Sequence, residues 1–491
     1  MSKLSKRLAG ASVDSLLLAF VKFFTLATGL LCTMILSHNL SLQTYGTYSQ
    51  GNLVVTLCAN ATILGLADAA NYFFNRSDGK RDLNAYANTV FTTQLIIGVA
   101  TASVILICRN WIVGYFNNPL LEPVLLYVAF RPMLTNMTSI LQVLIVSIGK
   151  AKLVAVRNAA FSALKLLAVF LTALATSDIV ILFAILLALD MMTVAWFWLM
   201  FRKNRFSVRP VILDLTLVKE ILSFSVPMAL YVLTTSLTRQ IGALIIGANE
   251  STDMYAIYAN CATVLPFDVV SASFLTVMIP IVTRYIAHAE YDKARNLFKH
   301  YLAIGYLTTV TFSVACLVIA PEMVKILYGE KYLPGLTVFC LYLISGMAKF
   351  ANLSLILSAS GKTKMLMAVS SASVIVNAVT CVVGYQLIGL EGPALTTVGV
   401  YIVTMVVLLG LSLKELRGRW SDAFEAKALA YYIATLSAAA AVGMLIKHTL
   451  FTLGAPWLPS AIAVALFVTG VVLLTNRKSL AASLKAINSM K

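Results

Sequence analysis

Long apolar runs separated by short polar breaks dominate this chain. A helix needs roughly 20 apolar residues to cross a bilayer core of about 30 Å, and run after run meets that length. The runs are continuous rather than alternating, which favours membrane-spanning helices over a β-barrel. Fourteen spans are predicted: 13–37, 46–74, 86–108, 120–148, 158–176, 179–201, 220–247, 254–283, 300–320, 335–358, 365–388, 392–413, 427–447 and 458–475.

Composition supports an all-α integral membrane protein. Hydrophobic residues make up 60% of the chain and charged residues only 12%, with a mean hydropathy of +0.89, which excludes an ordinary soluble protein. The first run follows basic residues as a secretory signal would, but it contains Asp14 and Lys22 and no cleavage site follows it. We therefore predict a retained first helix. The seven cysteines occur singly, so the sequence predicts neither a disulfide framework nor a metal site.

Two short patterns recur in the same order. Tyr45-Gly46-Thr47-Tyr48 returns 210 residues later as Tyr255-Ala256-Ile257-Tyr258, and Gly149-Lys150-Ala151-Lys152 returns 212 residues later as Gly361-Lys362-Thr363-Lys364. Together they indicate a tandem duplication of a helical unit, an architecture typical of secondary transporters. We expect two six-helix lobes, 1–210 and 211–415, followed by two further helices and a cytoplasmic tail in 416–491.

The basic residues predict the orientation of the chain. With the N-terminus inside, 28 of the 37 Lys and Arg lie in cytoplasmic segments and only 4 in outer loops. The positive-inside rule then places both termini in the cytoplasm. Anionic lipid headgroups account for the net charge of +17, so no nucleic-acid partner is needed.

The short polar segments leave little room for catalysis or nucleotide binding. The longest outer loops, 109–119 and 321–334, are too short to build an ordered extramembrane active site, so we predict a protein that is not an enzyme. The segment Ser360-Gly361-Lys362-Thr363 imitates the end of a P-loop, but Ile356 replaces its first glycine and no strand precedes it. No nucleotide or other cofactor is therefore expected.

Charged residues inside spans are the candidate functional groups, because an intramembrane charge costs several kcal/mol unless it is paired or faces water. Eight lie inside the predicted spans and away from the span ends: Lys22, Arg131, Lys165, Arg239, Lys349, Asp68, Asp190 and Asp268. At about 1.5 Å per residue, Arg131, Lys349, Asp190 and Asp268 lie more than about 12 Å from either end of their spans. Lys165 and Asp68 lie nearer the cytoplasmic ends, where snorkelling to the interface is expected.

The cations occupy equivalent spans of the two halves. Lys22 and Arg239 lie on spans 1 and 7, and Arg131 and Lys349 lie on spans 4 and 10. This arrangement predicts a positively charged lumen that binds an anionic headgroup such as a phosphate or diphosphate. The alternative is that Arg131 or Lys349 only neutralises Asp190 or Asp268.

Two further groups of residues have open interpretations. Asp268, close after Pro266 in a span that the proline is expected to kink, can couple transport to a proton or cation, or pair with a cation. The aromatic outer segment with Tyr328, Tyr332 and Phe339 is predicted to form an interfacial belt, with stacking on a sugar as the alternative. The repeated Tyr pairs at 45/48 and 255/258 are likewise predicted to anchor helix starts at the outer interface.

At this point the chain resembles a known family. The stretch Leu36 to Leu66, and the stretch from Ile326 to Tyr332 followed by a span ending in Ser360-Gly361-Lys362, are similar to Wzx-type polysaccharide and O-antigen flippases. These belong to the multidrug/oligosaccharidyl-lipid/polysaccharide exporter (MOP) superfamily. The resemblance implies two lobes around an alternating-access cavity in a bacterial inner (cytoplasmic) membrane.

The resemblance also implies a function. It suggests export of undecaprenyl-diphosphate-linked oligosaccharide for O-antigen, capsule or exopolysaccharide synthesis, with membrane lipids, a polysaccharide polymerase and chain-length machinery as partners. In relatives, cations in the cavity hold the diphosphate, which suits Lys22 and Arg239. The alternative is a proton- or sodium-coupled multidrug antiporter of the same fold, although cationic drugs favour an acidic cavity.

Overall fold

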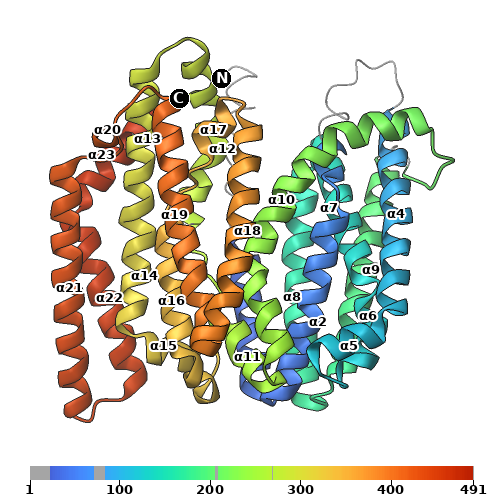
Figure 1. Ribbon diagram of the computed structural model, residues 1–491, viewed down its shortest axis with the longest axis horizontal. Helices are drawn as coiled ribbons and strands as arrows, with labels where there is room; N and C mark the ends of the chain where they lie inside the picture. The colour runs from blue at the N-terminus through green and yellow to red at the C-terminus, as the bar shows by residue number, and fades with distance from the viewer. Residues whose placement is uncertain (1–20, 22, 71–82, 205–207, 268, 490–491) are drawn as a thin grey trace. The chain divides into compact units, whose positions relative to one another are not determined.

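Most of the described chain is helical, as the apolar runs predict. A computed structural model describes residues 21, 23–70, 83–204, 208–267 and 269–489, and these ranges are mainly helical and contain no strand (Figure 1). Within them, nine helical stretches are long and apolar enough to cross a membrane, and a bent pair in 269–287 would make a tenth. One of the nine, residues 363–415, contains two helices, α18 and α19. The all-α membrane fold is confirmed, and the count of fourteen spans stays a prediction.

The chain forms two compact units. The first unit comprises residues 1–240 and 246–256, and the second comprises 241–245 and 257–491. The division between these two units falls within α10 and α11. The predicted lobes, 1–210 and 211–415, with the 416–491 extension, remain a division based on the sequence repeat.

Helices of the first unit pack around α7. Its elements are Phe23–Asn39, α2 (Leu42–Thr62), α4 (Leu83–Ile107), α5 (Arg109–Phe116), α6 (Leu121–Val128), α7 (Arg131–Ser147), α8 (Ala151–Ala175), α9 (Ile179–Lys203), most of α10 (Leu215–Asn249) and the start of α11 (Thr252–Cys261). Ile140, Leu141 and Leu144 of α7 are fully buried in one core cluster with Phe197 and Phe201 of α9. Asn136 also donates from Nδ2 to the Ala59 carbonyl, 3.0 Å away. Apolar packing and interhelical hydrogen bonds together hold α7 in place.

The sequence repeat corresponds to repeated local structure. Gly149 and Gly361 each follow a helix in the left-handed region, with φ of +75° and +71°. The next amide, of Lys150 or Lys362, donates back to the carbonyl of Ile145 or Leu357 at 3.1 and 2.8 Å. This is the Schellman arrangement, in which glycine avoids the steric cost of a Cβ. Both halves therefore end a helix in the same way.

The repeated tyrosine motifs share a helix start. Ser41 and Ser251 each accept from the backbone amide three residues later, at 3.1 and 3.3 Å, which is an N-cap. The N-terminal ends of α2 and α11 are in contact. Gly46 of α2 lies against the backbone and side chain of Thr252 of α11, and a Cβ on Gly46 would clash there.

That contact corrects the predicted role of these tyrosines. Tyr45, Tyr255 and Tyr258 are at most 3% exposed, so they pack inside the protein rather than anchor it at the interface. Tyr328 and Tyr332 are also buried, with ring centroids 5.9 Å apart. The belt prediction was wrong for this cluster, because Tyr332 and Phe339 pack against Tyr328 in tilted and edge-to-face arrangements and all three side chains are buried.

Helices of the second unit surround a long buried helix. Its elements are α12 (Val269–Ala287), α13 (Tyr291–Gly305), η1 (Tyr306–Val310), α14 (Thr311–Val318), α15 (Ala320–Leu327), η2 (Glu330–Gly335), α16 (Leu336–Ala348), α17 (Leu355–Ala359), α18 (Thr363–Ile388), η3 (Gly389–Glu391), α19 (Gly392–Glu415), α20 (Trp420–Ala423), α21 (Ala426–Thr452), α22 (Trp457–Thr475) and α23 (Arg477–Ser489). The stretch 291–318 is the most buried of the candidate spans. The helices α21 and α22 form a hairpin, and α22 packs against α14 (Figure 1).

Small and hydroxylated residues hold α18 and α19 together. Gly384 and Gly392 lie in backbone contact, where a Cβ on either would clash. Further along the pair, Asn377 Oδ1 accepts from the Thr397 hydroxyl at 3.2 Å, and Ser373 and Thr404 share a 2.8 Å hydrogen bond. Such contacts are typical of helices that associate in lipid.

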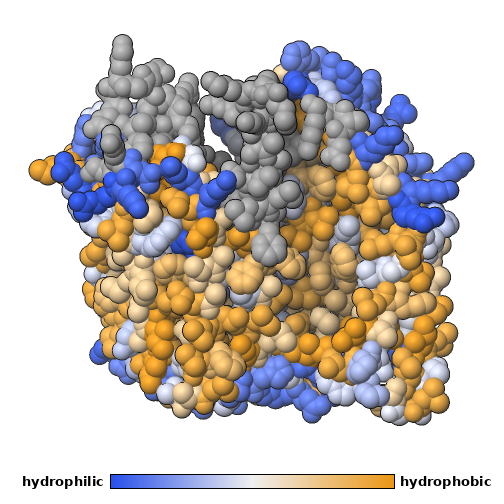
Figure 2. All heavy atoms as spheres, turned by 180° about the vertical axis from the view of Figure 1, so that it is seen from behind, coloured by the Kyte–Doolittle hydropathy of each residue, from blue (hydrophilic) through white to orange (hydrophobic). Residues whose placement is uncertain are grey.

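Apolar side chains cover the middle of the visible face. Figure 2 shows them between hydrophilic side chains at its upper and lower edges. In the α18–α19 pair, Ile375, Val379 and Val403 are at least 60% exposed, which suits contact with lipid tails rather than water.

Helical structure is interrupted within the second unit. Residues 262–267 and 349–354 are non-helical, and η1 is a π-helical turn. Pro266 therefore stands in a break between α11 and α12, instead of kinking one helix as predicted. The Thr309 hydroxyl lies 3.2 Å from the Phe267 carbonyl and 3.3 Å from the Phe350 carbonyl. Non-helical backbone at membrane depth needs such protein partners.

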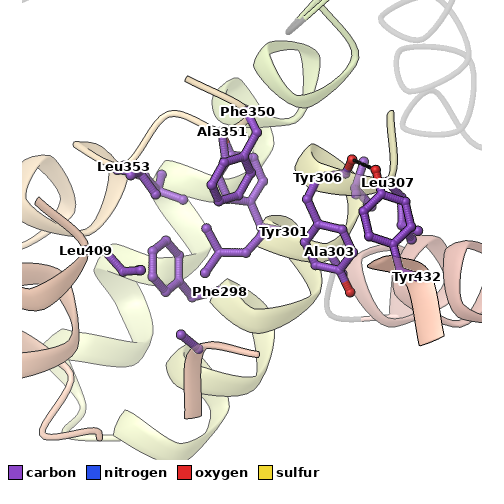
Figure 3. Close-up of a cluster of buried hydrophobic side chains, with 14 of the residues drawn as sticks. Phe298, Tyr301, Ala303, Tyr306, Leu307, Phe350, Ala351, Leu353, Leu409 and Tyr432 are labelled. Carbon is purple, nitrogen blue, oxygen red and sulfur yellow. Dashed lines mark hydrogen bonds between the residues drawn. The ribbon is translucent and has the colours of Figure 1, made fainter. Parts of the chain in front are cut away.

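The π-turn also has a partner on α21. The hydroxyl of Tyr432 donates to the Tyr306 carbonyl at 2.9 Å and lies 3.1 Å from the Thr311 hydroxyl. Figure 3 shows Tyr432 beside Tyr306, with Phe298, Tyr301 and Phe350 in the same core cluster. The C-terminal hairpin is thus joined to the interrupted region by a hydrogen bond as well as by packing.

Candidate functional site

A polar cavity lies inside the first unit. Its volume is about 350 Å³, and its walls come from α7, α8, α9 and the first described helix. The lining residues are Thr25, Arg131, Gln142, Arg157, Asn158, Phe161, Ser162, Lys165, Leu186, Leu189, Asp190 and Thr193. Three of these described residues are cations and one is a carboxylate, so together they carry a surplus of two positive charges.

Helical periodicity explains why these side chains converge. On α8, Arg157, Phe161 and Lys165 are spaced by four residues, so they form one stripe along the helix. Leu186, Leu189, Asp190 and Thr193 form the matching stripe on α9. The two helices pack against each other, which brings both stripes to one cavity.

Arg131 and Asp190, both predicted as site residues, form an ion pair. Arg131 Nε lies 2.8 Å from Asp190 Oδ2, and its Nη1 donates to Asn52 Oδ1 at 3.2 Å. The guanidinium carbon also lies 5.8 Å from the centroid of the Phe183 ring. Burial of a cation requires such compensation, because an unpaired buried charge is costly. Asp190 thus neutralises and orients Arg131.

Arg157 has a different environment. Its guanidinium lies between Phe161 and Phe197, 5.2 and 5.0 Å from their ring centroids. Nη1 donates to Asn158 Oδ1 at 2.7 Å, whereas the buried Nε has no hydrogen-bond partner in the described part of the chain. Aromatic faces hold the cation in place without neutralising it. A planar guanidinium held in this way can present its N–H groups to a phosphate.

The other predicted site residues fall into three groups. Lys22 and Asp268 lie outside the described residues. Arg239 has an exposed side chain on α10 of the first unit. Lys349 belongs to the second unit, where its ammonium lies 3.3 Å from the ring centroid of Tyr401 on α19, a cation–π contact. Of the four predicted residues that the structure describes, Arg131 and Asp190 lie together in this cavity.

Arg157 and Lys165 are not among the site residues predicted from the sequence. Arg157 lies between the predicted spans 120–148 and 158–176, and the position of Lys165 near the cytoplasmic end of its span predicts snorkelling to the interface. The four-residue spacing Arg157, Phe161, Lys165 was the available signal, since it predicts a shared face on α8. The sequence does not show that this face of α8 packs toward Asp190 on α9.

The family described as "Polysaccharide biosynthesis protein" matches residues 35–337, more than half of the 491 residues. No curated protein sequence matches the chain.

Solved structures agree on the fold. The lipid II flippase MurJ, in an inward closed conformation, matches with a TM-score of 0.72 at 13% identity over 94% of this chain and 99% of that chain. An inward-facing MATE multidrug resistance transporter of the MOP superfamily matches with a TM-score of 0.65 at 13% identity, covering 82% and 98%. A MOP superfamily transporter from Pyrococcus furiosus gives 0.57 at 12% identity, covering 82% and 94%. The MOP fold that the sequence resemblance implied is confirmed.

Proposed function

Because the chain belongs to the polysaccharide biosynthesis protein family, we propose that it is a flippase for lipid-linked oligosaccharides. Its substrate is an undecaprenyl-diphosphate-linked oligosaccharide, carried from the inner to the outer leaflet of a bacterial inner membrane. The observation that supports this most directly is the cationic cavity of the first unit. Its surplus of two positive charges complements the two negative charges of a diphosphate diester.

The three cavity cations have different roles in binding the diphosphate. Arg157, fixed by aromatic rings, presents its N–H donors to the diphosphate, and Lys165 adds a mobile point charge. Arg131 contributes when phosphate oxygens replace the Asp190 carboxylate as its partner. Lys22, Arg239 and Lys349 remain predicted contacts along the path of the headgroup.

Alternating access moves the headgroup while the prenyl tail stays in lipid. The two repeat-related lobes rock so that the cavity opens first to one side of the membrane and then to the other. A proton or sodium gradient drives the cycle, with Asp190 and Asp268 as the predicted coupling carboxylates. Asp190 suits this role because it can exchange Arg131 for the coupling cation.

The test is complementation of a strain depleted of this protein. Surface polysaccharide and the internal lipid-linked precursor are measured with wild type, Arg157→Ala or Arg131→Ala at matched membrane abundance. Removing a charge-assisted hydrogen bond costs about 1.5–3 kcal/mol, so we expect Arg157→Ala to lower export about tenfold or more. Precursor should accumulate inside.

Arg202→Ala is the matched control. Arg202 lies at the end of α9 against the Trp198 ring, 4.8 Å from its centroid, and does not line the cavity. It should export normally. Normal surface polysaccharide in the depleted strain, together with sensitivity to cationic drugs, would instead favour the multidrug antiporter.

A further inference from the structure

A second cavity, mainly apolar with a few charged and polar residues, lies where α21 connects to α22 in the C-terminal hairpin. It has a volume of about 430 Å³ and lies where α14 and α15 meet the α21–α22 connection, all within the second unit. The residues that line it are Val318, Glu322, Met444, Lys447, His448, Phe451, Ala455, Trp457, Ser460 and Ala461. It shares no residue with the cationic cavity of the first unit.

Charges of both signs meet in this cavity. Lys447 Nζ lies 2.7 Å from Glu322 Oε2 and donates to the Val318 carbonyl at 3.1 Å. An ammonium has three N–H groups, so a third donor remains after these two contacts. The second oxygen of Glu322 can likewise accept another donor. The pair is therefore partly satisfied and able to bind one anionic and one cationic group.

The surroundings of the cavity are apolar and face outward. Phe451 and Leu453 on the hairpin tip are 78% and 76% exposed, and Met444 is more than half exposed. Trp457, about half exposed at the start of α22, is the residue type that concentrates at the level of lipid headgroups. A ligand at this position meets charged groups at one end and hydrocarbon at the other.

We propose that this cavity binds the headgroup of a zwitterionic phospholipid with a primary amine, of the phosphatidylethanolamine type. The phosphate accepts from Lys447 and His448. The ammonium donates to Glu322. The acyl chains follow the exposed apolar side chains of the hairpin. Charge complementarity selects this headgroup over an anionic one, which would leave Glu322 facing a phosphate.

Lipid titration of the full-length protein tests the proposal. Native mass spectrometry in detergent gives the affinities for phosphatidylethanolamine, phosphatidylcholine and phosphatidylglycerol, and thermal unfolding with each lipid gives a second readout, because a ligand that binds the folded state stabilises it. We expect phosphatidylethanolamine to bind most tightly and to raise the unfolding temperature most. Equal affinity for the three lipids in the wild type would overturn the proposal without any variant.

Substitutions then locate the site. Glu322→Gln should weaken phosphatidylethanolamine binding about tenfold and leave phosphatidylglycerol binding unchanged or tighter. Lys447→Met should weaken both. The control is Glu290→Gln, which removes a carboxylate paired with Lys293 at 3.1 Å outside the cavity and should change neither. Equal losses in Glu322→Gln and Glu290→Gln would assign the effect to overall charge.

Competition with a soluble headgroup tests whether the ligand is a membrane lipid or a water-soluble zwitterion. Soluble glycerophosphoethanolamine carries the same phosphodiester and ammonium charges without acyl chains, and we expect it to displace the lipid at least about tenfold less effectively per mole, because it buries no apolar surface. Displacement as strong as by the lipid itself would make the cavity a site for a water-soluble zwitterion and contradict the assignment to lipid.

Discussion

Arg131 and Arg157 line the same cavity but are held by different interactions. Arg131 is paired with Asp190, and their side chains are 10% and 29% exposed. Arg157 instead lies between two aromatic rings. The first cation is neutralised and the second is held in place with its charge available, so Arg157 is the better candidate for first contact with an anion.

The ion pair predicts the consequence of removing one partner. Asp190→Asn leaves Arg131 without its carboxylate, and we expect a loss of about 1–3 kcal/mol in unfolding free energy. The double variant Arg131→Gln/Asp190→Asn should recover part of that loss, because it leaves no uncompensated charge. Thermal unfolding in detergent measures both. Additive losses in the double variant would contradict the coupling of the two side chains.

At the scale of helices, the repeated glycine turns predict matched effects. Gly149→Ala and Gly361→Ala should each destabilise the protein by about 1 kcal/mol, because alanine is strained at positive φ. No atom lies within 4 Å of the position of either added Cβ, so the cost is conformational.

Gly399→Ala is the control for these turns. Gly399 lies inside α19 with equally open surroundings, and alanine there should be neutral or stabilising by up to about 1 kcal/mol. The unfolding temperatures of Gly149→Ala, Gly361→Ala and Gly399→Ala test whether the positive φ causes the loss of stability. A loss at Gly399 as large as at the turns would mean that the backbone conformation is not the cause.

The interrupted helix predicts a second effect at this scale. Tyr432→Phe removes the hydroxyl that donates to the Tyr306 carbonyl and keeps the ring packing. The buried carbonyl then lacks this donor, at a cost of about 1–3 kcal/mol. Tyr431→Phe, at a neighbouring residue that is 54% exposed, should change stability by less than about 0.5 kcal/mol. Indistinguishable unfolding curves would show that the π-turn does not depend on α21.

At the scale of the whole molecule, the basic residues predict which ends of the helices face outward. Cys108 is the exposed cysteine of the seven and lies next to the predicted outer loop. A membrane-impermeant maleimide should label it in right-side-out vesicles, and Cys108→Ser should abolish that labelling. Labelling confined to inside-out vesicles would reverse the predicted topology.

Local sequence determined the helices, the repeat and the family. Apolar runs specify membrane helices one by one, and the repeated glycine and serine positions specify turns and caps through contacts within a few residues. These predictions therefore hold without knowledge of packing. Arg131 and Asp190 could be recognised as candidates for the same reason, since an intramembrane charge stands out in any span.

Only the tertiary structure decided which faces of the helices meet. The spans are apolar almost all round, so their periodicity does not distinguish a side facing lipid from a side facing protein. Tyr328 and Tyr332 are buried by a neighbouring ring rather than exposed at the interface, and Arg157 reaches Asp190's cavity because α8 packs on α9. Such contacts join residues far apart in the chain. Their energies depend on interaction partners that the local sequence pattern does not identify.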